Sequence, residues 1–464
     1  MMKRIVLTAV LTAASLPAVA AEDLIDAYRQ ARESDPTFQQ AQAELTTARE
    51  ALPQARAGIL PEIGANASAQ RTYQDVDPDG APSMNESFNS VSYGVELRQP
   101  VFRYDAFEQL DVAEASVAQA TARFASAEQA LMTRVAERYF GVLDAQVALQ
   151  AAQAQLKAIN RQLEQARERF DVGLIARTDV EEAKARYDTA RAGVIQAENA
   201  LESALASLRE VTGASYEDLA RVREGVELTA PSPAEEDAWR QRAEEQNWDL
   251  TAARRSAEAA MERVDVARGG HYPQVDAVAS YGGSHASGGV GSSGVTGGSD
   301  SQELAAGLEL TVPLYTGGET SSRVRETQSQ YTEARAALEA TRRSVTRAAA
   351  DAYRGVQTAL QRVQALDQAR TSNRTALSAT EAGFEVGTRT IVDVLDAQQR
   401  LFEAERDYQQ ARHDYLLNTL RLQETVGSLG EDDLASINQL LAEEVGPYVS
   451  VEAIDSEEDA SPSQ

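Results

Sequence analysis

Residues 91–110, VSYGVELRQPVFRYDAFEQL, change from the pattern of a strand to that of a helix. The first part alternates apolar and polar residues, which is the period of a strand with one apolar face; its apolar members are Val91, Tyr93, Val95 and Leu97. After Pro100 the pattern becomes helical and runs to Phe170 without another proline and with Gly141 as its only glycine. At about 1.5 Å per residue this helix is roughly 100 Å long. The sequence therefore predicts a strand that continues directly into a very long helix, with proline ending the strand pairing.

An apolar seam follows the whole predicted helix over 104–170. Its members recur every seven residues, shift once by four, and then recur every seven again: Leu110, Val117, Phe124, Leu131, Val135, Val142, Leu149, Leu156, Leu163 and Phe170. Heptad spacing is typical of a coiled coil, and a four-residue shift locally unwinds the supercoil. The returning helix over 178–212 has the same spacing. Taken alone, these helices also fit an ordinary antiparallel coiled-coil hairpin without a channel.

The chain contains two copies of one unit. Trp239 lies 211 positions after Tyr28 and Gly427 lies 214 positions after Gly213, with matched residues between them at a nearly constant offset. The predicted segments are a signal peptide (1–21), a first repeat (22–213), a connecting equatorial segment (214–235), a second repeat (236–427) and a C-terminal equatorial segment with an acidic disordered tail (428–464). Each repeat begins with a helix and continues with two strands and two long helices; the strands are predicted at 60–73, 90–102, 272–282 and 303–315, and the long helices at 104–170, 178–212, 318–384 and 390–426.

The N-terminus predicts an exported protein. A short basic region precedes the apolar run over 5–16, and the small residues up to Ala21 allow cleavage. No later run of about 18 apolar residues predicts a transmembrane helix. The four alternating segments of about 10 residues suit a barrel wall with lipid outside and water inside, and a soluble antiparallel sheet has the same alternation. Four strands cannot close a membrane barrel and an open edge is not tolerated in lipid, so a barrel requires several copies of the chain.

Composition argues against several other classes of protein. The formal net charge of -28 would repel phosphates, so we expect no nucleic-acid partner. The chain has no cysteine, which excludes disulfides, thiolate metal sites and lipid attachment at cysteine. The three histidines, His271, His285 and His413, are far apart in the sequence. We therefore expect no enzyme activity, no metal site and no cofactor.

Two related segments carry a resemblance to a known family. They are GTRTIVDVLDA over 387–397 and RFDVGL over 169–174, which leads to Thr178, Asp179 and Val180. The chain resembles the TolC family of outer-membrane channels over nearly all of its mature length, and the lack of cysteine fits the branch without lipid. The resemblance implies a mixed α and β membrane protein, a trimer whose four strands per chain share a 12-stranded antiparallel β-barrel that continues into a long α-helical coiled-coil barrel in the periplasm.

The resemblance also implies a function and partners. We expect a passive channel-tunnel in the outer membrane, with its barrel in outer-membrane lipid and its helices in the periplasm. A homotrimer would serve tripartite multidrug efflux or type I protein secretion, or both. A periplasmic adaptor (membrane fusion protein) and an inner-membrane efflux or ABC transporter would open its periplasmic end. The alternative is a soluble periplasmic coiled-coil scaffold without a channel. It explains the helices but not the alternating strands or the prolines at the four predicted strand–helix junctions, Pro61, Pro100, Pro273 and Pro313.

The hairpin ends contain the predicted site residues. Gly173 and Gly387 can adopt the left-handed conformation that ends a helix, and a capping box is expected from Thr178 with Glu181 and, in a weaker form, from Thr390 with Asp393. The resemblance implies three groups: a periplasmic gate network of Gln162, Thr178, Asp179, Phe384 and Arg389; a cation-selective ring of Asp393 and Asp396, three apart on one helix face; and adaptor-docking tips at Gly173, Leu174, Gly387 and Thr388. The family commonly has tyrosine where this chain has Phe384, so the closed state is expected to be less constrained here.

Overall fold

The computed structural model describes residues 22–76, 84–216, 218–288 and 298–442. The predicted signal peptide over 1–21 and the acidic tail from 443 onward lie outside the described residues. The chain divides into two compact units. The helical unit comprises Met1–Gln39, Ala127–Asn247 and Val345–Gln464, and the sheet unit comprises Gln40–Ser126 and Trp248–Ser344. Two long helices, α4 (Tyr104–Asp171) and α8 (Glu319–Glu385), contribute residues to both units.

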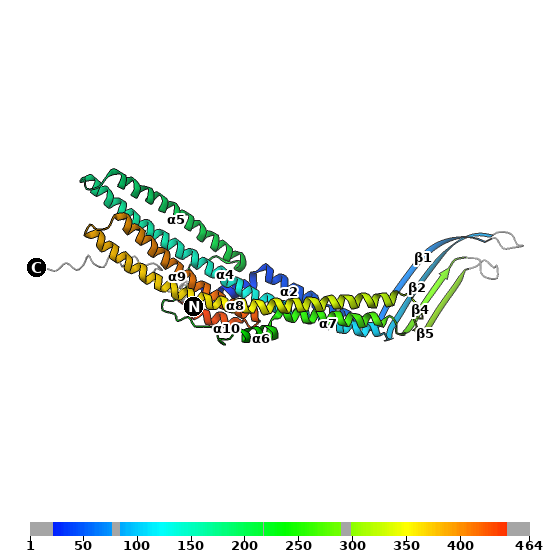
Figure 1. Cartoon of the computed structure of the whole chain (residues 1–464). Helices are drawn as coiled ribbons and strands as arrows, with labels where there is room; N and C mark the ends of the chain where they lie inside the picture. The colour runs from blue at the N-terminus through cyan, green and yellow to red at the C-terminus, as the bar shows by residue number, and fades with distance from the viewer. Residues whose placement is uncertain (1–21, 77–83, 217, 289–297, 443–464) are drawn as a thin grey trace, which may run out of the picture. The chain divides into compact units, whose positions relative to one another are not determined.

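The sheet unit is built on four antiparallel strands in the order β1-β2-β4-β5 (Figure 1). The strands are β1 (Glu62–Val76), β2 (Met84–Phe102), β4 (Gln274–Ala286) and β5 (Ser299–Thr311). β1 and β2 therefore extend beyond the predicted 60–73 and 90–102 into the segment between those two ranges. The last strand was expected to end at 315, but β5 ends at Thr311, two residues before Pro313, which lacks the N–H that strand pairing requires.

The register of the sheet gathers apolar residues on one face. One row across the four strands consists of Ile63, Leu97, Ala279 and Ala306, and the next of Ala65, Val95, Tyr281 and Leu304. The rows between them are largely polar, and hydroxyl pairs join neighbouring strands at Ser68–Ser92 and Ser284–Ser301, each 2.8 Å between oxygens. Because side chains alternate between the faces of a strand, the predicted period of two becomes one apolar and one polar face.

We expected Pro100 to end its strand, but the strand continues beyond it. Pro100 lies inside β2, where the register with β4 shifts between Pro100 and Phe102. A bulge tolerates proline because one residue there is left out of the regular ladder. The strand then continues to Phe102, and α4 begins at Tyr104, so the strand does run almost directly into the long helix. Three further helices belong wholly or mainly to this unit: α2 (Pro36–Arg49), α3 (Ala51–Ala57) and α7 (Trp248–Gly269).

In the helical unit, two long hairpins lie side by side. One is formed by α4 with α5 (Arg177–Thr212), and the other by α8 with α9 (Ile391–Val426). Leu163 and Ala166 of α4 pack against Ala183 of α5. Leu377 of α8 packs against Val394 and Ala397 of α9, and Val147, Ala151 and Ala154 of α4 pack against Phe402 of α9. The order across the unit is therefore α5-α4-α9-α8, and the hairpins meet through α4 and α9 (Figure 1).

The internal repeat is visible in the core of the helical unit. Tyr139 of α4 and Tyr353 of α8, which match in the sequence, are both buried. The Tyr139 hydroxyl donates to the Ala220 carbonyl at 2.6 Å, and the Tyr353 hydroxyl donates to the Ala234 carbonyl. Each copy of the unit thus holds the connecting segment through the same residue. Three short helices and a two-stranded pair complete the unit: α1 (Leu24–Ser34), α6 (Glu236–Gln246), α10 (Glu431–Asn438), β3 (Arg221–Val222) and β6 (Leu441–Ala442).

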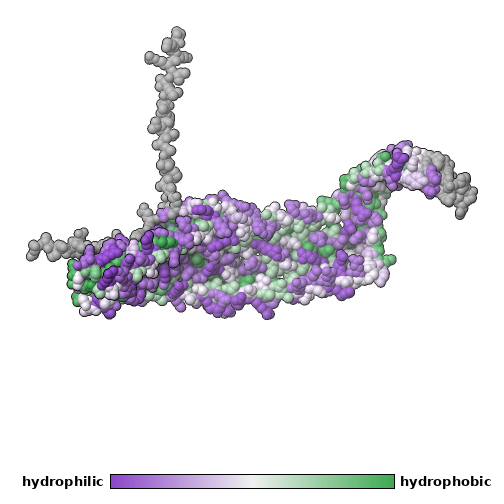
Figure 2. Space-filling view, turned by 90° about the horizontal axis from the view of Figure 1, so that it is seen from above, coloured by the Kyte–Doolittle hydropathy of each residue, from purple (hydrophilic) through white to green (hydrophobic). Residues whose placement is uncertain are grey.

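Polar side chains cover most of the surface of the long helices in Figure 2, and apolar patches between them are small. Among the described residues, no helix combines the length and the apolar character that crossing a membrane would require.

Candidate functional site at the hairpin ends

The two hairpin turns have the same backbone geometry. Gly173 and Gly387 each have φ of 77°, a left-handed conformation that residues with a side chain rarely adopt. The amide of Leu174 donates to the Arg169 carbonyl at 2.9 Å, and the amide of Thr388 donates to the Gly383 carbonyl at 2.8 Å. These bonds satisfy carbonyls at the ends of α4 and α8, so each glycine ends one helix and reverses the chain.

The helices that leave the turns are capped differently. α9 has a reciprocal capping box: the Thr390 hydroxyl accepts from the Asp393 amide at 3.2 Å, and the Asp393 carboxylate accepts from the Thr390 amide at 2.8 Å. The predicted capping box of Thr178 with Glu181 is wrong, because α5 begins at Arg177 and Thr178 already lies in its first turn. The residue before α5 is Ala176, whose amide donates to the Asp179 carboxylate at 3.2 Å. Asp179 therefore caps α5 without a side-chain partner at Ala176.

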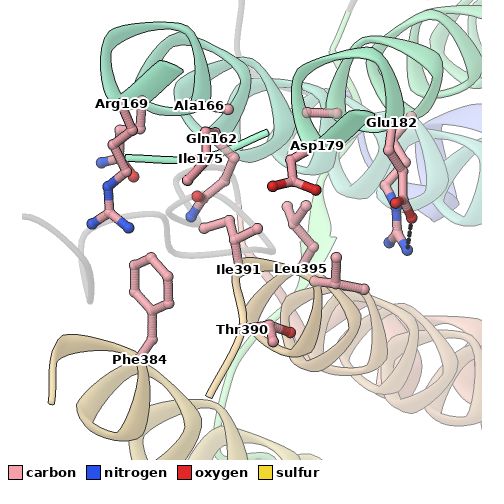
Figure 3. A pocket seen from close by; sticks show the side chains of 14 residues that line it. Gln162, Ala166, Arg169, Ile175, Asp179, Glu182, Phe384, Thr390, Ile391 and Leu395 are labelled. Atoms are coloured by element: carbon pink, nitrogen blue, oxygen red, sulfur yellow. Dashed lines mark ion pairs between the residues drawn. The ribbon is translucent and has the colours of Figure 1, made fainter. Parts of the chain in front are cut away.

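A groove of about 330 Å³ lies between the two hairpin ends (Figure 3). Its walls come from α4, the first turn and α5 on one side, and from α8 and α9 on the other. Three predicted gate residues line it: Gln162, Asp179 and Phe384. Apolar side chains of Ile175, Ile391 and Leu395 project into the same space. The groove thus places polar groups among aliphatic walls at the junction of the two hairpins.

Phe384 contacts an arginine from the other hairpin. The guanidinium carbon of Arg169 lies 4.8 Å from the centroid of the Phe384 ring, and Figure 3 shows the two side chains facing each other across the groove. A cation at this distance is attracted by the electron-rich face of an aromatic ring. Phe384 lacks the hydroxyl of tyrosine, but its ring still forms a contact between α4 and α8.

Arg186 of α5 joins the two hairpins through an ion pair. Its guanidinium lies 2.9 Å from an Asp396 carboxylate oxygen on α9 and 3.6 Å from a Glu182 carboxylate oxygen on its own helix. The hydrogen bond to Asp396 is the main cause that raises the pKa of Arg186 above its ordinary value. The side chain of Arg186 is about two-thirds covered, so the contact is partly shielded from water.

The two predicted ring carboxylates therefore both have partners in the chain. Asp393 accepts hydrogen bonds from the amide and the hydroxyl of Thr390, at 2.8 and 2.9 Å. These bonds, the backbone one first, lower the pKa of the Asp393 carboxyl below its ordinary value and keep it ionised at neutral pH. Asp396 is bound to Arg186. A ring of free carboxylates at these positions stays a prediction.

The predicted gate network is not joined within one chain. The Thr178 hydroxyl reaches Asp179 only at 3.5 Å. Among the residues that the structure describes, Arg389 forms no ion pair, and its side chain instead lies against Gly383. The amide oxygen of Gln162 is buried and has no hydrogen-bond partner in the described part of the chain. The structure thus brings Gln162, Asp179 and Phe384 to one groove and leaves Arg389 outside it.

The sequence did not single out Arg169 and Arg186, two cations that contact the opposite hairpin close to its turn. The repeat offset of 214 aligns Arg186 with Arg400 and Glu182 with Asp396, so the sequence did contain a signal for a charged set on each copy. No sequence feature indicated which arginine would cross to the other hairpin.

Two long segments of the chain, residues 27–214 and 239–428, match the family described as outer membrane efflux protein. The chain belongs to the outer membrane efflux protein family. Outer membrane protein TolC of Vibrio cholerae is 37% identical to it over 421 residues, which cover 91% of this chain and 94% of that protein. The alkaline protease secretion protein AprF of Pseudomonas aeruginosa is 31% identical, with 89% of this chain and 85% of that protein covered.

A solved member of the same fold is the Campylobacter jejuni CmeC outer membrane channel, with a TM-score of 0.75 and 15% identity over 93% of this chain and 90% of that one. These similarities confirm the predicted resemblance, the TolC-like fold class and the outer-membrane location. The two matched segments also coincide with the two sequence repeats. As a member of the outer membrane efflux protein family, the chain is an outer-membrane channel for efflux or secretion, and the family is one of transport channels and not of enzymes.

Proposed function

We propose that three copies of the chain form one continuous duct, with the four strands of each chain in the outer membrane and the helices in the periplasm. The two edges of the sheet carry this proposal. Over the described residues, β1 and β5 each pair with one neighbour only, so each has a row of free backbone groups. Such edges cannot remain open in lipid, where each unpaired group costs several kcal/mol. Pairing of β5 with β1 of the partner subunit closes the wall, and three copies supply 12 strands.

The apolar face of the sheet supports contact with lipid. Leu304 and Leu308 of β5 are 78% and 74% exposed in the single chain, and Ile63 of β1 is 71% exposed. These residues share the face that the register makes apolar. On the other face, Arg98 lies 3.4 Å from both Asp276 and Glu309, as suits a surface in contact with water. Apolar outward and polar inward faces are typical of a membrane barrel wall.

The hairpin ends are the proposed gate. Arg389 has no ion-pair partner among the described residues of its own chain, so it is available to Asp179 and Thr178 of the partner subunit. Gln162 and Phe384 line the same groove as Asp179. An arginine–carboxylate contact between chains stabilises one packing over another, which suits a two-state gate. Arg389→Ser is expected to raise single-channel conductance; a conductance equal to that of the parent channel would contradict this role.

Asp393 and Asp396 are the proposed cation-selective ring. The bonds from Thr390 lower the pKa of Asp393, and three copies of each carboxylate would concentrate negative charge at the entrance. The ion pair of Asp396 with Arg186 reduces the charge that this position contributes, so Asp393 is expected to dominate the selectivity of the closed end. Asp393→Ala with Asp396→Ala should lower the preference for cations; full retention of that preference would exclude the assignment.

The hairpin turns are the proposed docking surface for a periplasmic adaptor. Leu174 is 73% exposed beside Gly173, and Val386 is 75% exposed beside Gly387 and Thr388. Apolar side chains on an exposed turn are typical of a protein interface. An adaptor bound there would connect the duct to an inner-membrane efflux or ABC transporter, which supplies the energy and selects the cargo.

One set of measurements tests the assembly. The protein, purified from the outer-membrane fraction in detergent, is expected to give the mass of a trimer by native mass spectrometry and to form cation-selective channels in planar bilayers. Recovery as a water-soluble monomer from the periplasmic fraction, with no conductance in bilayers, would contradict the proposal.

A further inference from the structure

The ion pair of Arg186 with Asp396 connects the first copy of the repeat to the second. Arg186 lies on α5 and Asp396 on α9, with 2.9 Å between the guanidinium nitrogen and the carboxylate oxygen. Because the helices are ordered α5-α4-α9-α8, this contact spans the junction between the two hairpins. It is thus an interface contact between two homologous units that happen to belong to one chain.

Each copy of the repeat carries the same set of charges. The set consists of two acids three residues apart, followed by an arginine four residues later. It is Asp179, Glu182 and Arg186 in the first copy, and Asp393, Asp396 and Arg400 in the second. The offset is 214 at all three positions, the same as between Gly213 and Gly427. Members of the set therefore occupy equivalent places on α5 and α9.

Only one of the two possible cross-pairs is formed within the chain. The arginine of the first copy binds the second acid of the second copy. The reciprocal pair would join Arg400 to Glu182. Across the described ranges of the chain, Arg400 has neither a hydrogen bond nor an ion pair, and its side chain is exposed. Glu182 is also exposed, with 58% of its side chain accessible and a contact of 3.6 Å to Arg186. Arg400 also lies near enough to Asp393 of its own helix to help lower the pKa of that carboxyl. Within the described ranges, neither Arg400 nor Glu182 forms an ion pair with the other hairpin.

We infer that Arg400 binds Glu182 of the partner subunit. This inference rests on the proposed ring of three chains. In such a ring the second copy of each chain lies next to the first copy of the following chain. Within one chain, the two hairpins meet where α4 lies next to α9. Between chains, α8 then lies next to α5 of the partner subunit, and this junction is equivalent because α8 is the repeat of α4 and α9 is the repeat of α5. The same equivalence turns the observed pair of Arg186 with Asp396 into the pair of Arg400 with Glu182 of the partner subunit.

The consequence is a ring of alternating bonds around the periplasmic end. Every hairpin is held to the hairpin on each side by one arginine and one carboxylate, within the chain on one side and between chains on the other. Exposed ion pairs are individually weak. The set can therefore hold the end closed and still yield when a bound partner moves one hairpin, which suits a gate that opens by rearrangement of packed elements.

The absence of cysteine makes a direct test possible. Glu182→Cys with Arg400→Cys is treated with a short bis-maleimide, because a disulfide would require Cα atoms closer than about 7 Å. We expect covalent dimers and trimers on a denaturing gel. Arg186→Cys with Asp396→Cys is the matched control and should link within one chain, giving only monomer of altered mobility. Glu181→Cys with Arg400→Cys tests the register, since Glu181 lies on a different side of α5, and should give far less crosslinking.

The experiment distinguishes failure of the proposed trimer from failure of the proposed pair of Arg400 with Glu182 of the partner subunit. Native mass spectrometry of the parent protein and of each variant reports the trimer independently of the crosslink. Trimeric Glu182→Cys with Arg400→Cys protein that yields no covalent ladder would overturn the pair and leave the assembly intact, whereas a monomeric parent protein would overturn the assembly on which the pair rests.

Charge reversal provides a second readout. Arg400→Glu alone and Glu182→Arg alone are each expected to raise the fraction of time that single channels spend open in planar bilayers. The combination of both changes should return that fraction towards the value of the parent protein, because the opposite charges face each other again. A combined variant that is no nearer to the parent than the single variants would also overturn the pair.

Discussion

The guanidinium of Arg169 lies 4.8 Å from the centre of the Phe384 ring and joins the end of α4 to the end of α8. This contact accounts for how a phenylalanine can serve at a position where the resemblance leads one to expect tyrosine. The face of the phenylalanine ring attracts a cation from the opposite hairpin. A tyrosine at this position could form a hydrogen bond through its hydroxyl in addition. This contact between the two hairpins thus combines an aromatic surface with a positive charge.

Removal of this contact should loosen the gate. A cation over an aromatic ring at a partly exposed site contributes about 0.5–1 kcal/mol, so Arg169→Gln or Phe384→Leu is expected to increase the open fraction of single channels by a factor of about 2 to 5. Arg169→Lys, which keeps a charge, should have a smaller effect. Phe384→Tyr keeps the ring and adds a hydroxyl that can form a further hydrogen bond within the groove, so it should lower the open fraction. Equal open fractions for Arg169→Gln and Arg169→Lys would show that the charge has no role.

Loss of the Arg186 charge should strengthen cation binding at the entrance. Arg186→Gln removes the partner of Asp396 and leaves its carboxylate free. Three additional free carboxylates should increase the preference for cations and lower the concentration of a divalent or trivalent metal ion that blocks the channel. Reversal potentials in asymmetric salt and block by added metal ion measure both effects. Arg177→Gln is the control, because Arg177 is exposed and its partner Glu181 lies 3.8 Å away on the same helix; a change of equal size in that variant would contradict the prediction.

The sequence predicted the fold in detail because its signals are periodic and repeated. Val95 alternates with polar neighbours because successive side chains of a strand point to opposite faces. The apolar seam through Leu163 has the seven-residue spacing of a coiled coil. Both patterns can be recognised without tertiary information. The end of β5 and the bulge at Pro100 were predicted less well. Both depend on how a proline is accommodated by the neighbouring strand, which a single segment does not reveal.

The candidate site was less predictable, for a physical reason. Gln162, Asp179 and Phe384 line one groove, and their role in a gate stays a prediction. Arg186 and Arg169, by contrast, look like ordinary surface charges at helical spacing, and the choice of a partner across hairpins depends on the rotation of one helix against another. The capping prediction failed in a similar way. Thr178 has the right residue type, but the turn ends two residues earlier, at Ala176, so the helix begins before Thr178 can cap it.

The cap of α9 should make the second hairpin sensitive to acid. Hydrogen bonds from Thr390 lower the pKa of Asp393 in the folded protein below its value of 3.8 in the unfolded chain. A carboxyl group whose pKa is lowered by folding contributes stability that is fully present above the unfolded pKa and is lost as the pH falls through the folded pKa. Hydrogen exchange of the first turn of α9 is therefore expected to be slow at pH 7 and to accelerate, relative to the rest of α9, only below about pH 4.

Thr390→Ala tests the same cap at constant pH. The hydroxyl accepts from the Asp393 amide and donates to its carboxylate, so its loss should cost about 1 kcal/mol locally. Amides in the first turn of α9 should exchange several-fold faster, and the acid dependence should shift to higher pH because Asp393 loses one of its donors. Thr178→Ala is the matched control, since Thr178 does not cap α5. Equal acceleration in the two variants would contradict the assignment of the cap.

The two faces of β5 should respond differently to a positive charge. Leu304 lies in an apolar row with Tyr281, Val95 and Ala65, and the adjacent residue Ala305 lies on the opposite face, in a row with Ser280 and Glu96. If the apolar face contacts lipid, Leu304→Arg places a charge in the hydrocarbon layer, at a cost of about 2–4 kcal/mol near the midplane. Ala305→Arg places the same charge in the water-filled interior.

We therefore expect Leu304→Arg to reduce the yield of heat-resistant trimer in the outer membrane, and Ala305→Arg to assemble with a yield close to that of the parent protein. Three additional positive charges in the lumen should at the same time lower the preference of the Ala305→Arg channel for cations, because a ring of arginines repels them. Both variants replace one residue of β5 with arginine at neighbouring positions, so a general effect on the strand would affect them equally. Normal assembly of Leu304→Arg together with failure of Ala305→Arg would mean that the sheet faces the opposite way, with its apolar side towards the lumen.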